Sequence, residues 1–143
     1  RVIAIDNSEK MVEYGSGVAQ RHGVANLEYR LGDLEELPIE DGSVDIALFH
    51  QSLHHALHPL AATREAFRIL RPGGRIVVLD LLKHRFEQAR EMYADVWLGF
   101  PQVELVRLLR EAGCANVEVQ AVHKEDEAPH FETVLAIGEK PSG

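Results

Sequence analysis

The sequence has little of several features that would define a class of protein. Its single cysteine, Cys114, leaves no partner for an internal disulfide and rules out a metal site built from several cysteines of these 143 residues. No apolar run approaches the roughly 18 residues of a membrane span. Fifteen basic residues stand against 23 acidic ones, a net charge of −8, which disfavours nucleic acid. We therefore expect a small-molecule ligand, no membrane or nucleic-acid partner, and a reducing, cytoplasmic setting.

The residues that are present predict one globular domain. Hydrophobic residues make up 45% of the chain, enough for one core of this length. The sequence opens on Arg1 and passes directly into the apolar run at 2–5, with no preceding turn or cap. We therefore expect these residues to be the retained or ordered part of a longer protein.

Short apolar runs alternate with helical patterns along the chain. The runs predict strands at 2–5, 27–31, 44–49, 75–82, 117–122 and 133–137. Helices are predicted from Asp6–Ser8 to His22–Gly23, after Pro59 until Pro72-Gly73-Gly74, over 83–97, and from Pro101 to Gly113. Residues 34–42 are expected to form a loop. This order predicts a doubly wound, mostly parallel α/β sheet that ends in an antiparallel strand pair.

Two carboxylates follow predicted strands, and each has two interpretations. Asp6 can accept hydrogen bonds from the hydroxyls of a ribose, or it can cap the next helix, as Ser8 can. Asp33 can accept from an adenine amino group, or it can be a turn aspartate after Gly32.

Four of the eight histidines lie between positions 50 and 58. His50, His54 and His58 are spaced i, i+4, i+8, which would align them for a metal on a continuous helix. Pro59 and the strand predicted at 44–49 argue against that helix, so we predict no metal site. His54 or His55 could instead be a catalytic base, the alternative being that one packs under the next helix and the other faces solvent.

Three segments carry a family resemblance. VIAIDNSEKM, GDLEELPIEDGSVDIALFHQSLHH and REAFRILRPGGRIVVLD occur here in the order and spacing of class I S-adenosylmethionine-dependent methyltransferases, which the chain resembles over essentially its whole length. Within this family, VWLGF and HKEDEAPHFETVLAIGEK resemble the methyltransferase domains fused behind arsenic-repressor-type winged-helix regulators. Arsenite methylation itself would need several thiolates, whereas Cys114 has the pattern of a small packed residue.

The resemblance implies a Rossmann-like fold, S-adenosylmethionine as cofactor, and transfer of its methyl group to a small-molecule acceptor. It places Asp6 on the ribose hydroxyls, Met11 near the adenine, and Asp33 on the adenine amino group. The residues implied in cofactor binding are Asp6, Asn7, Met11, Asp33, Leu34 through its backbone N–H, and His50.

One part of the family pattern is absent from these residues. The first strand and its Gly-rich loop should precede Val2 and should lie centrally, between the strands that end at Asp6 and Phe49. We therefore interpret residues 1–143 as a partial methyltransferase domain that could be inactive alone. The alternative function is a catalytically silent cofactor-sensing or dimerisation module attached to a DNA-binding regulator, and a homodimer stays open in either case.

Overall fold

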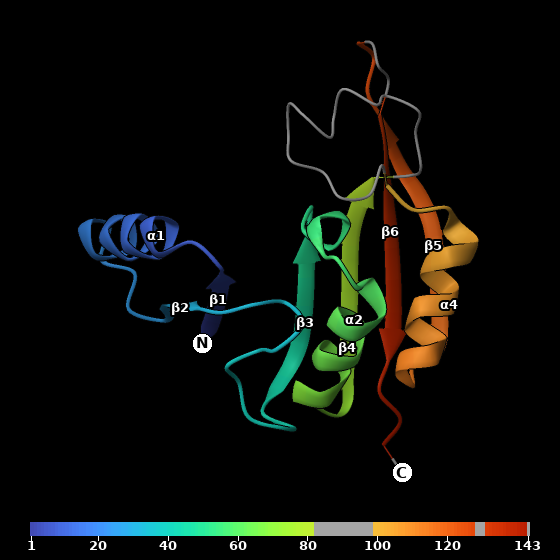
Figure 1. Ribbon diagram of the computed structural model, residues 1–143, viewed down its shortest axis with the longest axis horizontal. Helices are drawn as coiled ribbons and strands as arrows, with labels where there is room; N and C mark the ends of the chain where they lie inside the picture. Colours follow the sequence, from blue (N-terminus) through green and yellow to red (C-terminus); the bar gives the residue numbers. More distant parts are fainter. Residues whose placement is uncertain (82–98, 128–130, 143) are drawn as a thin grey trace. The chain divides into compact units, whose positions relative to one another are not determined.

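A computed structural model describes residues 1–81, 99–127 and 131–142 of the chain (Figure 1). The described chain divides into two compact units, residues 1–39 and residues 40–143, and each is described here by itself. The helix predicted over 83–97 lies outside the described residues. The assignment of 1–143 to one partial domain stays a prediction.

Residues 1–39 form a strand, a helix and a second strand. Strand β1 (Val2–Asp6) runs parallel to β2 (Leu27–Leu31), and helix α1 (Glu9–Arg21) connects them. The helix begins after Ser8, whose hydroxyl accepts the N–H of Met11 at 3.4 Å, and His22 is the C-cap residue that follows its end. These three elements confirm the strands and the helix predicted for this part of the chain.

Residues 40–143 form a four-stranded sheet in the order β3-β4-β6-β5. The strands are β3 (Val44–His50), β4 (Leu70–Leu81), β5 (Ala115–Lys124) and β6 (Glu132–Glu139). Strands β3 and β4 are parallel, and β6 runs antiparallel to both of its neighbours. The predicted α/β fold with an antiparallel C-terminal pair is confirmed, with the reversed strand β6 lying one position inside the edge (Figure 1).

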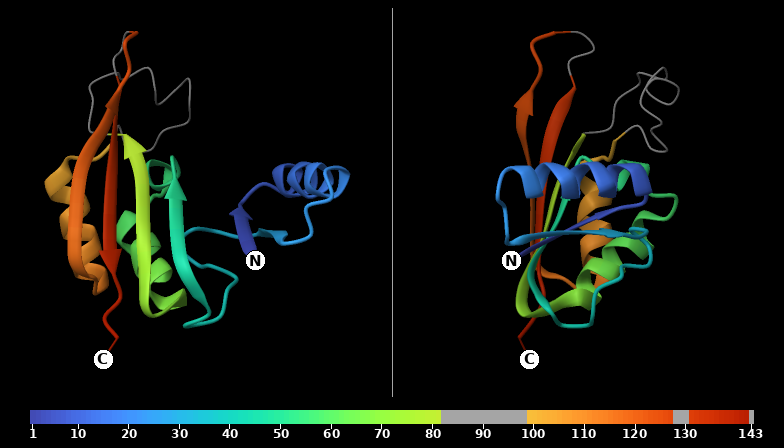
Figure 2. Two further views of the ribbon diagram at one scale, coloured as in Figure 1. Left: turned by 180° about the vertical axis from the view of Figure 1, so that it is seen from behind. Right: turned by 90° about the vertical axis from the view of Figure 1, so that its left-hand side faces the viewer.

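Helices α2 (Pro59–Ile69) and α4 (Gln102–Ala112) cover one face of this sheet (Figure 2). The strands alternate accordingly: Ile76, Val78 and Asp80 of β4 are fully buried, as are Val134 and Ala136 of β6, whereas the residues between them are half-exposed. Leu105, Leu108 and Leu109 of α4 complete the core, and their i, i+3, i+4 spacing is typical of one buried helix face. The side chains that close this core come from segments far apart in the sequence.

The predicted start of the fourth strand was wrong. Helix α2 ends at Ile69, and β4 begins immediately at Leu70 instead of at Arg75. Gly73 has φ +86°, its N–H donates to the carbonyl of Lys140 at 2.8 Å, and the N–H of Lys140 donates to the carbonyl of Gly74 at 2.8 Å. These long-range hydrogen bonds hold the Pro-Gly-Gly segment as an irregular part of the sheet, which a local turn signal could not indicate.

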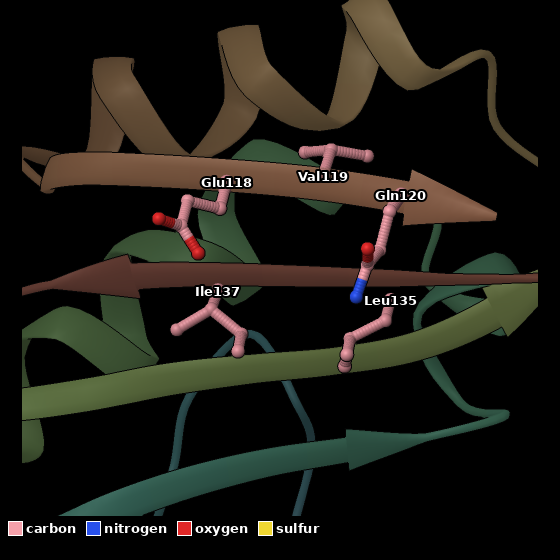
Figure 3. A pocket seen from close by; sticks show the side chains of 5 residues that line it. All are labelled: Glu118, Val119, Gln120, Leu135 and Ile137. Atoms are coloured by element: carbon pink, nitrogen blue, oxygen red, sulfur yellow. The ribbon is translucent and has the colours of Figure 1, made fainter. Parts of the chain in front are cut away.

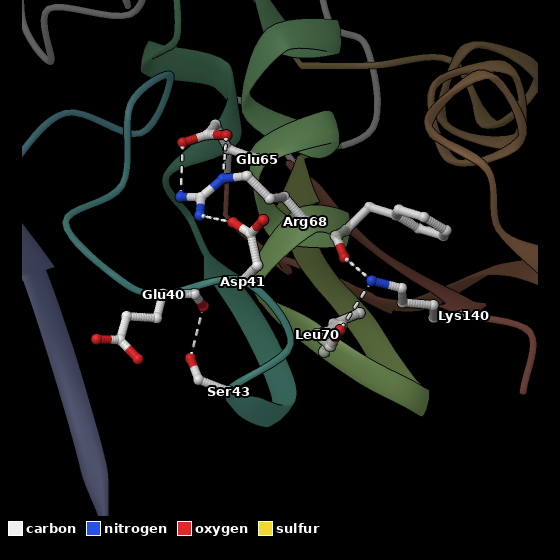
Figure 4. Close-up of polar contacts among 8 residues, drawn as sticks. Glu40, Asp41, Ser43, Glu65, Arg68, Leu70 and Lys140 are labelled. Atoms are coloured by element: carbon white, nitrogen blue, oxygen red, sulfur yellow. Dashed lines mark hydrogen bonds and ion pairs between the residues drawn. The ribbon is translucent and has the colours of Figure 1, made fainter.

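Two cations fix the end of α2 (Figure 4). Arg68 donates to Glu65 at 2.7 Å and to Asp41 at 2.5 Å, and these bonds raise the pKa of the guanidinium. The Nζ of Lys140 donates to the carbonyls of Phe67 and Leu70 at 3.0 and 2.9 Å. Because the last carbonyls of a helix lack intrahelical donors, Lys140 supplies them and joins the helix end to the C-terminal segment.

The two glycines within α1 offer a matched test of this packing. A Cβ on Gly15 would lie 2.4 Å from Cζ of Tyr29, whereas a Cβ on Gly17 would have nothing within 4 Å. Both positions gain the same helix propensity on substitution by alanine. We expect Gly17→Ala to stabilise α1 by about 0.5–1 kcal/mol and Gly15→Ala to destabilise it by about 1–3 kcal/mol through the clash with Tyr29.

Native-state hydrogen exchange of the α1 and β2 amides in the full-length protein measures both effects. Equal stabilisation by the two substitutions would show that Gly15 does not pack on the ring of Tyr29.

Candidate functional site

The two predicted carboxylates lie at the same edge of the β1–β2 sheet. Asp6 is the last residue of β1, and Asp33 follows the end of β2 by two residues. The strands are parallel, so their carboxyl ends meet at one edge. One oxygen of Asp6 accepts the N–H of Ser8 at 2.9 Å, and one oxygen of Asp33 accepts the N–H of Glu35 at 2.7 Å. Ser8, not Asp6, is the residue that caps α1.

The other residues implied in cofactor binding divide between the two units. Asn7 and Met11 are exposed beside Asp6, and Leu34 is half-buried beside Asp33. His50 is exposed at the end of β3 and belongs to residues 40–143. Their roles in binding stay predictions.

Residues 50–58, the histidine segment, begin at the end of β3. The second of these residues has a backbone conformation that is unusual for a residue with a side chain. Gln51 has φ +54° and donates its N–H to the carbonyl of Leu79 on β4 at 2.7 Å. A left-handed conformation at a residue with a Cβ is costly and is commonest where function constrains the chain. The turn leads into the 3-10 helix η1 (Leu53–His55), whose Leu53 is fully buried.

This turn brings His54 to the carboxyl end of β4. The ring Nδ1 of His54 lies 2.6 Å from Oδ1 of Asp80, and the backbone N–H of His54 donates to Oδ2 at 3.1 Å. The N–H of Leu81 donates to Oδ1 at 2.7 Å. Asp80 is 0% and His54 5% exposed, so the pair is held inside the protein.

His55, the other candidate base, lies beside this pair. The centroids of the two imidazoles are 4.1 Å apart, and His55 is exposed. The structure thus gives His54 a buried carboxylate at Nδ1 and places His55 toward solvent. The prediction named both residues, and their catalytic roles are not tested by this geometry.

Sequence reasoning missed Asp80. The sequence did contain a pattern that singles out Asp80. In the apolar run RIVVLDLL, Asp80 follows Ile76 and Val78 at every second position, so it lies on the same face of the strand as they do. A charged side chain on the buried face of a strand needs a partner. The sequence does not show that His54, 26 positions earlier, is that partner.

The structure does not place the histidines spaced i, i+4, i+8 on one continuous helix. His50 ends β3, His54 lies in η1, and His58 precedes α2, so the three histidines are not on one helix. Within 1–81, 99–127 and 131–142, no group of three or more His, Cys, Asp or Glu residues is placed to hold a metal ion. The helices of this described part are too short or too polar to cross a membrane.

A depression of about 210 Å³ lies over β5 and β6 (Figure 3). Its lining comes from the C-terminal strand pair and contains none of the predicted site residues: Glu118, Val119, Gln120, Leu135 and Ile137.

Residues 1–78 match the family model described as a methyltransferase domain. The chain belongs to this methyltransferase domain family. The matched part includes both carboxylates and the histidine segment, and Asp80 lies two residues beyond it.

Known proteins agree with this assignment. The chain is 30% identical to the demethylmenaquinone methyltransferase of Lactococcus lactis over 159 aligned positions, covering 93% of the chain and 63% of that protein. It is 27% identical to the arsenite methyltransferase of Halobacterium salinarum, covering 91% of the chain and 34% of that protein. The crystal structure of the YcgJ protein of Bacillus subtilis has the same fold, with a TM-score of 0.78 at 21% identity, over 99% of the chain and 82% of that structure. The chain thus spans less than two thirds of these two curated relatives.

Cys114 of this methyltransferase domain is packed as the sequence predicted. It is buried after the end of α4, its N–H donates to the carbonyl of Leu109 at 3.0 Å, and burial raises the pKa of its thiol to about 11. The thiolate is therefore scarce near neutral pH, which opposes a nucleophilic role.

This pKa gives a labelling prediction. Near pH 8, the thiolate fraction of Cys114 should be about 100-fold lower than that of a cysteine with a pKa of 9.0. We expect reaction with Ellman's reagent to be slower by at least this factor in the native protein and to become fast in denaturant. Native labelling as fast as denatured labelling would contradict the burial of this thiol.

Proposed function

We propose that the protein transfers a methyl group from S-adenosylmethionine to a small organic acceptor, in the cytoplasm. The proposal rests on the match of residues 1–78 to the methyltransferase domain family. It rests also on Asp6 and Asp33, the carboxylates at the edge where β1 and β2 end. In parallel α/β sheets, ligands bind outside the carboxyl ends of the strands.

The carboxylates of residues 1–39 suit the adenosyl part of this cofactor. Asp6 is half-exposed, and its Oδ2 makes no hydrogen bond to any described residue, so it can accept from ribose hydroxyls. Oδ2 of Asp33 likewise makes no hydrogen bond to any described residue. It is proposed to accept from the adenine amino group, with the N–H of Leu34 beside it. Asn7, Met11 and His50 complete the proposed set of cofactor-binding residues.

Methyl transfer requires the protein mainly to position the acceptor and the cofactor. The bound cofactor supplies an activated methyl group, and the protein must hold an acceptor in line with it. A base is needed only when the acceptor must lose a proton. His54 and His55 are the proposed candidates for that base.

The relatives help to define the acceptor class. Their names indicate demethylmenaquinone for one and arsenite for another. The single cysteine of these residues is buried and its thiol pKa is raised, so it does not provide the thiolates that would hold a metalloid. This supports an organic acceptor. The named relatives give no support to the alternative of a silent sensing module on a transcriptional regulator.

Titration of the full-length protein with S-adenosylhomocysteine, followed by calorimetry, tests the proposal. We expect Asp6→Asn to weaken binding about 10- to 100-fold, because the ribose loses hydrogen bonds to a charged acceptor. Glu13→Gln removes the same charge from an exposed position on α1 and should leave binding unchanged.

Absence of S-adenosylhomocysteine binding by the unaltered protein would overturn the proposal. Equal weakening by both substitutions would remove Asp6 from the binding site while leaving the cofactor assignment in place.

A further inference from the structure

We propose that Asp41–Gly42 is a site of spontaneous isoaspartate formation and that Arg68 suppresses this modification in the folded protein. The inference concerns the turn that leads into β3 and is independent of the proposed methyl transfer. Asp41 is the only aspartate of the 143 residues that a glycine follows. Glycine has no side chain to hinder attack by its own backbone nitrogen. The side chain of Asp41 is 81% exposed, so the water that the reaction needs can reach it.

The reaction needs no enzyme and no co-reactant other than water. The backbone nitrogen of Gly42 forms a bond to Cγ of the Asp41 carboxylic acid, and the acid hydroxyl leaves as water together with the proton of the nitrogen. The succinimide ring that results then adds water. Opening at the main-chain carbonyl routes the backbone through Cβ of Asp41 and lengthens it by that carbon, whereas opening at the side-chain carbonyl restores aspartate.

The nitrogen that would attack is held by the end of α2. Its N–H donates to the carbonyl of Arg68 at 3.0 Å, and the N–H of Ser43 donates to the carbonyl of Ile69 at 2.8 Å. The hydroxyl of Ser43 donates to the carbonyl of Glu40 at 2.7 Å and so closes the turn (Figure 4). Ring closure removes the proton of the Gly42 nitrogen and with it the hydrogen bond to Arg68, so this part of the turn has to open first.

The carboxyl group that would be attacked is held by the same arginine. Nη1 of Arg68 donates to Oδ1 of Asp41 at 2.5 Å, while Nε and Nη2 donate to Glu65 at 2.7 and 3.0 Å (Figure 4). The succinimide carries no charge, so ring closure also removes the ion pair between Arg68 and Asp41. Arg68 thus stabilises both reacting groups in their unreacted form, the nitrogen through its carbonyl and the carboxylate through its guanidinium.

Isoaspartate at this position would disturb the entry into β3. The additional backbone carbon would shift the N–H groups of Gly42 and Ser43 relative to the carbonyls of Arg68 and Ile69. These two hydrogen bonds join the end of α2 to the residues that precede Val44, the first residue of β3. We therefore expect protein that carries isoaspartate at position 41 to unfold at a lower denaturant concentration than unmodified protein.

Incubation of the full-length protein in oxygen-18 water at neutral pH, followed by peptide mapping, measures the reaction. Each ring opening adds one heavy oxygen to residue 41, and chromatography separates the isoaspartyl peptide from the aspartyl peptide. We expect the chain in denaturant to react at least about tenfold faster than the native protein, because both the hydrogen bond and the ion pair are then lost. Equal rates in the two states, or no ring opening at Asp41 in denaturant, would overturn the proposal.

Substitution of Arg68 tests the ion pair separately. Arg68→Met keeps the backbone carbonyl and should raise the native rate at Asp41 about 1.5- to 5-fold, the range of an exposed ion pair. Arg71→Met is the matched control, because Arg71 pairs with exposed Asp45 at 3.0 Å, and it should leave the rate unchanged. Glu65→Gln removes the charge of the other partner of Arg68 and should also leave the rate unchanged.

Two outcomes would overturn the role of Arg68. One is an unchanged rate in folded Arg68→Met protein, and the other is an equal rise in Glu65→Gln, which would assign the effect to the helix end. If Arg68→Met does not fold, salt gives the same test in the unaltered protein. Salt screens the exposed ion pair and should raise the native rate at Asp41 without changing the rate in denaturant, and a native rate independent of salt would overturn the role.

Discussion

Burial of one face of the four-stranded sheet is the constraint on which residues 40–143 depend. Helices α2 and α4 cover that face, so every second residue of β4 and β6 must be compatible with a closed core. Ile76, Val78 and Val134 satisfy this requirement with apolar side chains. Asp80 occupies an equivalent position with a charge, and its burial is compatible with folding because three donors from two segments meet its carboxylate.

The local elements were predictable because local patterns determine them. The strand at Leu27–Leu31 was predicted with its observed bounds, and the leucines of α4 lie on the buried face that their spacing indicated. Turn chemistry gave the start and end of α1 to within a residue or two. These features depend on neighbours within a few positions, which a single sequence contains.

The long-range contacts were not predictable in this way. The start of β4 at Leu70 depends on hydrogen bonds to Lys140, and the position of His54 depends on Asp80. A sequence shows that an aspartate lies on a buried strand face but not which side chain will meet it. The family resemblance supplied residues for the cofactor, whereas the pair at the end of β4 became visible only when the fold brought η1 and β4 together.

The double attachment of His54 to one carboxylate has a consequence for motion. Its ring and its backbone both bind Asp80, so the imidazole cannot turn away while η1 stays in place, and η1 cannot lift without taking the imidazole with it. The left-handed residue Gln51 sits where such a movement would pivot. Opening of this segment would therefore break both hydrogen bonds to Asp80 together, so the position of the imidazole and the position of η1 would be governed by a single conformational equilibrium.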